Sequence, residues 1–216
     1  SAAAILSYDV PHRAPWDYRV SLYTFTKSIA AGAFLVPILL VLMGDLTFES
    51  RLWTWTTPLL AGAFLALTGV ILIWDLEHPK RFLYVLLKPQ PRSWLVRGGF
   101  IITGYGGVLG LLFLGNYVDL SSIAWWLVVL GTPLAAMTAI YTAFLFAQAK
   151  ARDLWQSPLL PPHLLVQAII AGAGALILVA PTAAPDAVVP LGWIFAGANA
   201  VHLLMVLGEI TLTHGT

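Results

Sequence analysis

The chain has 216 residues, of which 59% are hydrophobic and 10% charged, and its mean hydropathy is +0.86. Soluble domains carry about a quarter charged residues, so this composition predicts an integral membrane protein in contact with lipid. A net charge of +1 and the lack of a basic tail give no indication of nucleic-acid binding. With no cysteine, the chain cannot hold a thiolate-ligated iron–sulfur cluster, so any such cluster is expected on a partner.

Six stretches of the chain are long and apolar enough to cross a membrane, which takes about 20 residues per helix. None has the alternating pattern of a membrane β-strand. The sequence therefore predicts an all-α, polytopic transmembrane bundle whose spans cover residues 20–43, 56–74, 98–114, 122–147, 163–180 and 188–210. Residues 1–19 are expected to form an N-terminal arm, and residues 20–216 a single transmembrane helical domain.

Basic residues gather at one end of this predicted bundle. When the spans alternate in direction, Arg51 falls at one end, and the other bases outside the spans fall at the opposite end: Arg13, Arg19, Lys80, Arg81, Lys88, Arg92, Arg97, Lys150 and Arg152. Cytoplasmic loops of membrane proteins are enriched in Lys and Arg. We therefore expect the N-terminal arm and the basic loop between the second and third spans to be cytoplasmic.

Aromatic and small residues indicate where the spans meet the interface and each other. Trp16, Tyr18 and Tyr23 are typical of an aromatic belt at one interface, and Trp53 and Trp55 of a belt at the other. The motif Ala-Gly-Ala-Phe-Leu occurs at residues 31–35 and again at residues 61–65, with a related stretch at residues 171–174. Such small residues predict close helix packing in membranes.

Lys27 is the clearest candidate functional residue, because it lies about two turns inside the first span. An ionisable side chain inside a span is costly and is commonly functional. Tyr23 and Thr24 share a helical face with it. The alternative is that Lys27 snorkels, with its stem in lipid and its ammonium among the headgroups. The position alone favours neither interpretation.

Acidic residues end the second span. Asp75 and Glu77 precede His78 and Pro79, and the proline stops the helix. Carboxylates oppose the helix dipole at a C-terminus and need basic partners there, so a solvated, ion-paired helix end is one interpretation. Asp75 lies deeper in the span than Glu77 and is the better candidate for a function.

Other polar residues lie in the later spans. Tyr141 is in the cytoplasmic half of the fourth span, where a packed, hydrogen-bonded tyrosine is the simplest interpretation. The fifth and sixth spans carry polar residues at helical spacing, namely His163, Gln167, Asn199, His202 and Glu209. These can relay protons or hold helices together, and we favour the second role. The few histidines make a poor bis-histidine set, so we expect neither haem nor a metal site.

Three stretches resemble the NrfD/PsrC family of membrane subunits: residues 15–35, residues 75–99 with their Asp-Leu-x-x-Pro-x-Arg-Phe pattern, and residues 141–173. The resemblance implies a haem-free subunit that binds a quinone, either menaquinone or ubiquinone, in a bacterial or archaeal inner membrane. It also implies a ferredoxin-like iron–sulfur partner and a catalytic redox subunit that depends on molybdenum or tungsten. Because family members usually have eight or more spans, we expect the sequence to be truncated.

By motif position, the resemblance places the quinone pocket at Thr24, Lys27, Asp75, Glu77 and Tyr141. We expect the neighbouring His78 to belong to the same pocket. Of these, Lys27, Asp75 and Tyr141 are expected to take part in the reaction. The expected function is electron exchange between the partner's iron–sulfur cluster and the quinone, with no complete activity in this chain alone. Two other functions remain open: a non-catalytic anchor for a redox complex, and an ion-translocating subunit that uses Lys27 and the polar residues of the sixth span.

Overall fold

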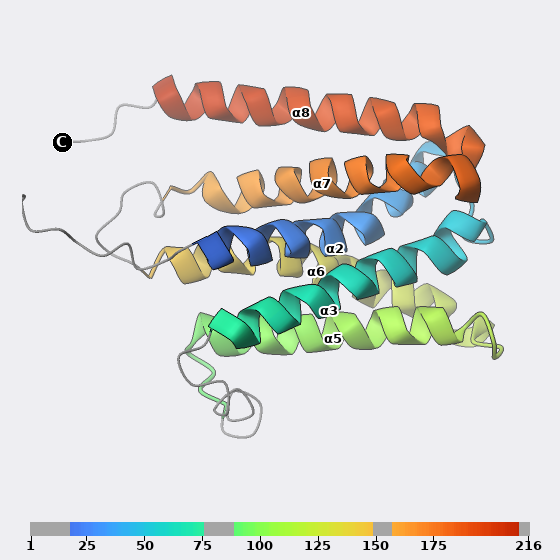
Figure 1. Cartoon of the computed structure of the whole chain (residues 1–216), viewed down its shortest axis with the longest axis horizontal. Helices are drawn as coiled ribbons and strands as arrows, with labels where there is room; N and C mark the ends of the chain where they lie inside the picture. Colours follow the sequence, from blue (N-terminus) through green and yellow to red (C-terminus); the bar gives the residue numbers. More distant parts are fainter. Residues whose placement is uncertain (1–17, 76–88, 149–156, 212–216) are drawn as a thin grey trace, which may run out of the picture.

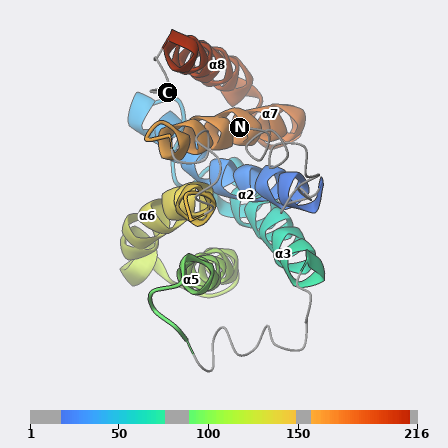
Figure 2. The same cartoon turned by 90° about the vertical axis from the view of Figure 1, so that its left-hand side faces the viewer.

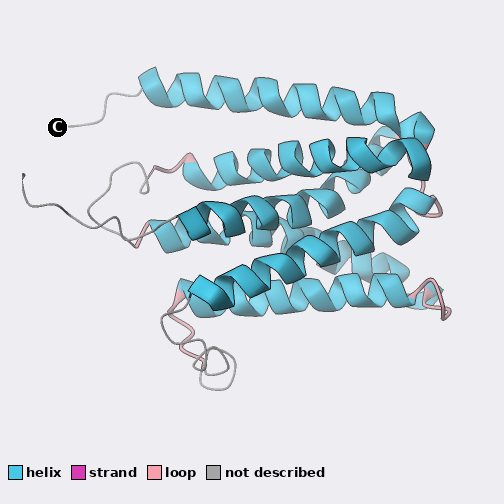
Figure 3. Ribbon diagram, viewed as in Figure 1, coloured by secondary structure: helices cyan, strands magenta, loops and turns pink. Residues whose placement is uncertain are grey.

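The computed structural model describes residues 18–75, 89–148 and 157–211, and its elements within these ranges are helices joined by short turns (Figure 3). Six helical segments are long and apolar enough to cross a membrane. This confirms the predicted all-helical fold, and the helix bounds lie within a few residues of the predicted spans. The long helices are α2 (Tyr18–Met43), α3 (Thr57–Asp75), α5 (Trp94–Leu114), α6 (Ser121–Phe146), α7 (Leu160–Ala183) and α8 (Val188–Thr211).

The helix α2 lies at the centre of the bundle. Figure 2 shows α7 on one side of it and α3 and α6 on the other, and α2 packs against all three. The helix α5 packs against α3 and α6, and α8 packs mainly against α7. In Figure 1 the start of α2, the end of α3 and the end of α8 lie at the same end of the bundle. Lys27 and Asp75 are therefore near the same membrane face.

Two glycines allow α2 and α7 to touch backbone to backbone. A Cβ atom on Gly32 would lie 1.8 Å from the Ala168 carbonyl oxygen, and one on Gly172 would lie 2.4 Å from the Gly32 Cα. This confirms the predicted close packing for two of the three small-residue stretches. The third behaves differently, because a Cβ on Gly62 would meet nothing within 4 Å. There the adjacent Ala61 is the fully buried residue.

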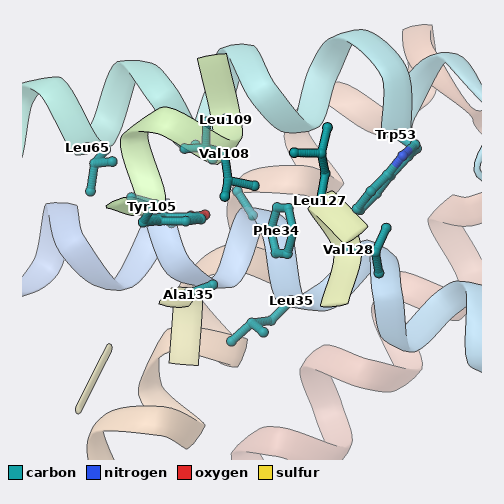
Figure 4. Close-up of a cluster of buried hydrophobic side chains, with 13 residues drawn as sticks. Phe34, Leu35, Trp53, Leu65, Tyr105, Val108, Leu109, Leu127, Val128 and Ala135 are labelled. Carbon is teal, nitrogen blue, oxygen red and sulfur yellow. The ribbon is translucent and has the colours of Figure 1, made fainter. Parts of the chain in front are cut away.

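An aromatic cluster fills the space between α2, α5 and α6 (Figure 4). The Phe34 ring lies 5.4 Å from the Trp53 ring and 5.8 Å, edge to face, from the Tyr105 ring. The Phe34 ring also fills the space next to Gly131 of α6. A Cβ atom added at Gly131 would lie 2.5 Å from the Phe34 Cζ. Trp53 is only 5% exposed, so its predicted place in an interfacial belt is wrong. Packing against Phe34 and Phe48 turns it inward.

A short π-helix, η1 (Leu52–Thr56), precedes α3 and was not predicted from the sequence. Its wide turn is visible in the backbone, where the Thr57 N–H donates to the Leu52 carbonyl five residues earlier. The Thr57 hydroxyl donates to the same carbonyl at 3.0 Å. A 3₁₀ turn, η4 (Pro185–Ala187), joins α7 to α8. Both turns lie at the end of the bundle opposite Lys27.

Candidate functional site

Lys27 is completely buried, with an exposed fraction of 0%. Its ammonium group donates to the Ala139 carbonyl at 2.9 Å and to the Thr142 hydroxyl at 2.5 Å, both on α6. It also lies 4.8 Å from the centre of the Tyr141 ring, in a cation–π arrangement. The side chain therefore points into the protein, and the snorkelling interpretation is wrong.

The Tyr141 ring lies beside Lys27 in a space that exists because residue 98 of α5 is a glycine. The hydroxyphenyl ring, 2% exposed, lies over Gly98, where a Cβ atom would come within 2.4 Å of the ring carbon Cε2. One turn away, the Trp94 and Phe144 rings stack with their centres 4.4 Å apart and fix the start of α5 against α6. The Tyr141 ring is thus enclosed between two helices.

Tyr23 connects this buried pair to the end of α3. It is 3% exposed, so its predicted place in an interfacial belt is wrong, and it faces the interior instead. It packs against Ile71, one turn before Asp75 on α3, and against Phe146 on α6. The sequence placed Tyr23 on the face of Lys27 but did not identify it as a neighbour of the end of α3, since that depends on how α2 packs against α3.

Asp75, the last residue of α3, lies at the more open end of this group. Its carboxylate is 3.7 Å from the guanidinium of Arg19, and the two side chains are 31% and 32% exposed. The same guanidinium lies 4.9 Å from the centre of the Trp74 ring. A basic partner of Asp75 is thus found on α2. Lys27, Tyr141, Tyr23 and Asp75 form a polar group that runs from the interior to the helix end.

Thr24 is another predicted site residue, and it does not join this group. Thr24 donates its hydroxyl proton to the Val20 carbonyl at 2.7 Å. It lines a separate groove between α2, α7 and α8, where it shares the wall with Gln167 and His202. Glu77 and His78 lie outside the described residues.

The polar residues of α7 and α8 meet each other across the helix pair. The Gln167 amide nitrogen lies 3.2 Å from His202 Nε2, and the Glu209 carboxylate lies 3.5 Å from His163 Nε2. The two histidine rings are edge to face at 5.2 Å. These contacts support the interpretation that the residues hold two helices together. Asn199 bonds within its own helix, to the Phe195 carbonyl.

Thr142, like Tyr23, is a site residue that was not identified from the sequence. It is fully buried and accepts the shorter of the two Lys27 hydrogen bonds. Threonine is common in membrane helices, and its position next to Tyr141 was the only available signal. One turn earlier, the hydroxyl of Thr138 is also buried, but it has no hydrogen-bond partner among the described residues. Of these two buried threonines, Thr142 is therefore the one that hydrogen-bonds to Lys27.

Together these features define a polytopic helical membrane protein with a buried, lysine-centred polar site near one membrane face. The family model for polysulphide reductase, NrfD, matches residues 7–188. The chain therefore belongs to the NrfD family and is a multi-pass membrane subunit of polysulphide-reductase-type complexes, which confirms the resemblance seen in the sequence. Comparison with curated proteins gave no match.

Proposed function

We propose that this subunit exchanges electrons between an iron–sulfur partner and a membrane quinone whose head group is held at the Lys27 site. The observation that carries the proposal is the burial of Lys27. Burying an ammonium group in a membrane protein is costly unless it is paired or has a function. Among the described residues, the partners of Lys27 are a carbonyl, a hydroxyl and an aromatic ring, all neutral. A function is therefore the better explanation.

The chemistry of this site fits a quinone head group. Quinone oxygens accept hydrogen bonds, and an ammonium group has three N–H donors. Two of those donors bond to Ala139 and Thr142, which leaves one for a ligand oxygen. Tyr141 adds a hydroxyl donor and an aromatic ring next to the ammonium. A bound quinone would supply the two-electron, two-proton redox chemistry that the side chains of this chain cannot supply.

In this proposal Lys27 donates a hydrogen bond or a proton to one oxygen of the head group, and Tyr141 binds the same ring. Protons are needed there because negative charge is strongly destabilised in a low-dielectric interior. Asp75, which is partly exposed, exchanges protons with the aqueous phase. Tyr23, which packs against α3 one turn before Asp75, is proposed to extend the path inward. Glu77 and His78 are proposed to assist Asp75.

We further propose that the iron–sulfur subunit docks at the end of the bundle that carries Lys27 and Asp75. The basic residues of the sequence gather at this end, which supports a cytoplasmic location for it in a bacterial or archaeal cell. A molybdenum- or tungsten-dependent catalytic subunit would complete the complex. The quinone is menaquinone or ubiquinone.

The test is binding of a fluorescent quinol analogue to the purified native complex, with wild type compared with Lys27→Met and Tyr141→Phe. We expect Lys27→Met to abolish binding and Tyr141→Phe to weaken it about tenfold, the effect of one lost hydrogen bond to a buried ligand. Tyr105→Phe is the matched control. It removes another fully buried hydroxyl, which donates to the Ala30 carbonyl one turn further along α2 and not to a partner of Lys27, and it should bind as wild type does.

Each variant must first be shown to retain its iron–sulfur partner. Equal binding by wild type and Lys27→Met would exclude Lys27 from the site. If the wild-type complex does not bind the analogue, the subunit acts as an anchor. Ion flux by this chain alone in liposomes would favour the ion-translocating function.

A further inference from the structure

A second groove lies at the opposite end of the bundle from Lys27, between η1, the start of α3 and the end of α7. Figure 1 shows these helix ends at the same end of the molecule. The groove has a volume of about 770 Å³. Its walls are Leu59, Leu60 and Ala63 of α3 and Val179 and Ala183 of α7. Leu59 is 52% exposed, so the groove opens toward the surrounding lipid.

The groove is apolar along its length and polar at its mouth. Arg51, Trp55, Thr56 and Thr182 supply the polar groups, and the lining contains no carboxylate. Arg51 is exposed, and the ion pairs found among the described residues, Arg19–Asp75 and His163–Glu209, do not include it. The mouth therefore carries a positive charge that the groove itself does not neutralise.

The local backbone explains why these polar groups share one mouth. In an α-helix a residue lies above its neighbour four positions on, whereas the π-turn of η1 widens the spacing to five. Both Trp55 and Thr56 therefore line the groove with Arg51. The Trp55 ring is fixed from behind by edge-to-face contacts with Phe113 at 5.9 Å and Tyr117 at 5.6 Å.

We propose that this groove is a binding site for a phospholipid, whose phosphate is held by Arg51 and one of whose acyl chains lies between α3 and α7. A guanidinium group binds phosphate through two parallel, charge-assisted hydrogen bonds. The indole N–H of Trp55 and the hydroxyl of Thr56 are suited to the ester oxygens at the interface. The apolar walls suit an acyl chain and do not suit a soluble phosphate compound.

The proposal is independent of the quinone site, because the two sites lie at opposite ends of the bundle. A phospholipid in this groove would brace the start of α3 against the end of α7. In the described residues these two helix ends touch each other little and are joined mainly through α2 and η1. Binding should therefore raise the temperature at which the complex unfolds.

The test is native mass spectrometry of the purified complex titrated with phosphatidylglycerol, and with diacylglycerol of the same chains as a ligand without phosphate. Wild type should bind phosphatidylglycerol at least about tenfold more tightly than diacylglycerol, as expected for a charge-assisted contact. Arg51→Gln should remove that preference, and Arg51→Lys should restore part of it. Equal binding of phosphatidylglycerol by wild type and Arg51→Gln would overturn the proposal.

A second pair of variants tests the acyl-chain site. Ala183→Leu fills this groove, whereas Ala66→Leu adds the same side chain to a neighbouring groove between α3 and α5 that Arg51 does not line. Both variants must unfold at the wild-type temperature in lipid-free detergent. Loss of phosphatidylglycerol only from Ala183→Leu supports the site. Equal loss from both variants would show that the lipid is annular, and a quinone retained in its place would equally overturn the proposal.

Discussion

The helices α2 and α8 are both long and apolar, yet they occupy opposite environments. In α2, 72% of the most apolar stretch is buried, against 11% in the segment that contains α8. The helix α2 touches α7 through glycine backbones and α6 through a buried ammonium group. The helix α8 meets α7 through side chains such as His202 and Glu209.

The difference shows what determines burial among helices in a membrane. Lipid tails are as apolar as leucine, so hydrophobicity does not select which helix becomes central. Close backbone approach and interhelical hydrogen bonds determine which helix becomes central. The proposed redox site lies on the helix that has both. The following three predictions test this comparison, starting with the largest expected effect.

Adding one methyl group to α2 should damage the fold far more than adding one to α8. In Gly32→Ala the new Cβ would lie 1.8 Å from the Ala168 carbonyl oxygen, so α2 and α7 must separate. We expect a loss of about 3 kcal/mol of unfolding free energy. Gly197→Ala, where nothing lies within 4 Å, should change it by less than about 0.5 kcal/mol. Unfolding in mixed detergent micelles measures both. Equal losses would mean that the glycine contact does not define the bundle.

The two buried threonines of α6 should respond differently to loss of the hydroxyl group. Thr142→Val removes an acceptor from the Lys27 ammonium and should cost about 1–3 kcal/mol in unfolding free energy. Thr138→Val removes a hydroxyl that has no partner among the described residues, so stability should be unchanged or higher. The same unfolding assay compares them, with Thr142→Ser as the variant that retains the bond. A Thr142→Val protein as stable as wild type would show that Lys27 does not depend on this bond.

The polar contact between α7 and α8 should contribute least. A double-mutant cycle of Gln167→Ala and His202→Ala should give a coupling energy near 0.6 kcal/mol, the average for such contacts in membrane helices. These variants should leave binding of the quinol analogue unchanged. A coupling above about 2 kcal/mol would place this pair among the main determinants of the fold.

The part of the candidate site that was predictable came from residues that are unusual where they stand. Lys27 was identified because a charge inside a span is rare, and the structure places it beside Tyr141 as expected. Tyr23 and Thr142 were not identified as site residues, because tyrosine and threonine are ordinary near membrane interfaces and in membrane helices. Their roles follow from the packing of α2 against α3 and α6. Thr24 shows the reverse case, since it shares a motif with Lys27 but faces another groove.

The sequence by itself determined the class, the six spans and the family, because each depends on composition and on motifs that are local in the chain. It also predicted close helix packing at the stretches that contain Gly32 and Gly172, since small residues favour such packing, but it did not predict that these two stretches contact each other. Only the tertiary structure decided that α2 is central and α8 peripheral, that Gly62 makes no close contact, and that Tyr23 and Trp53 turn inward. The physical reason is that a membrane makes every span apolar, so the partner of each helix face is set by contacts between residues far apart in the chain.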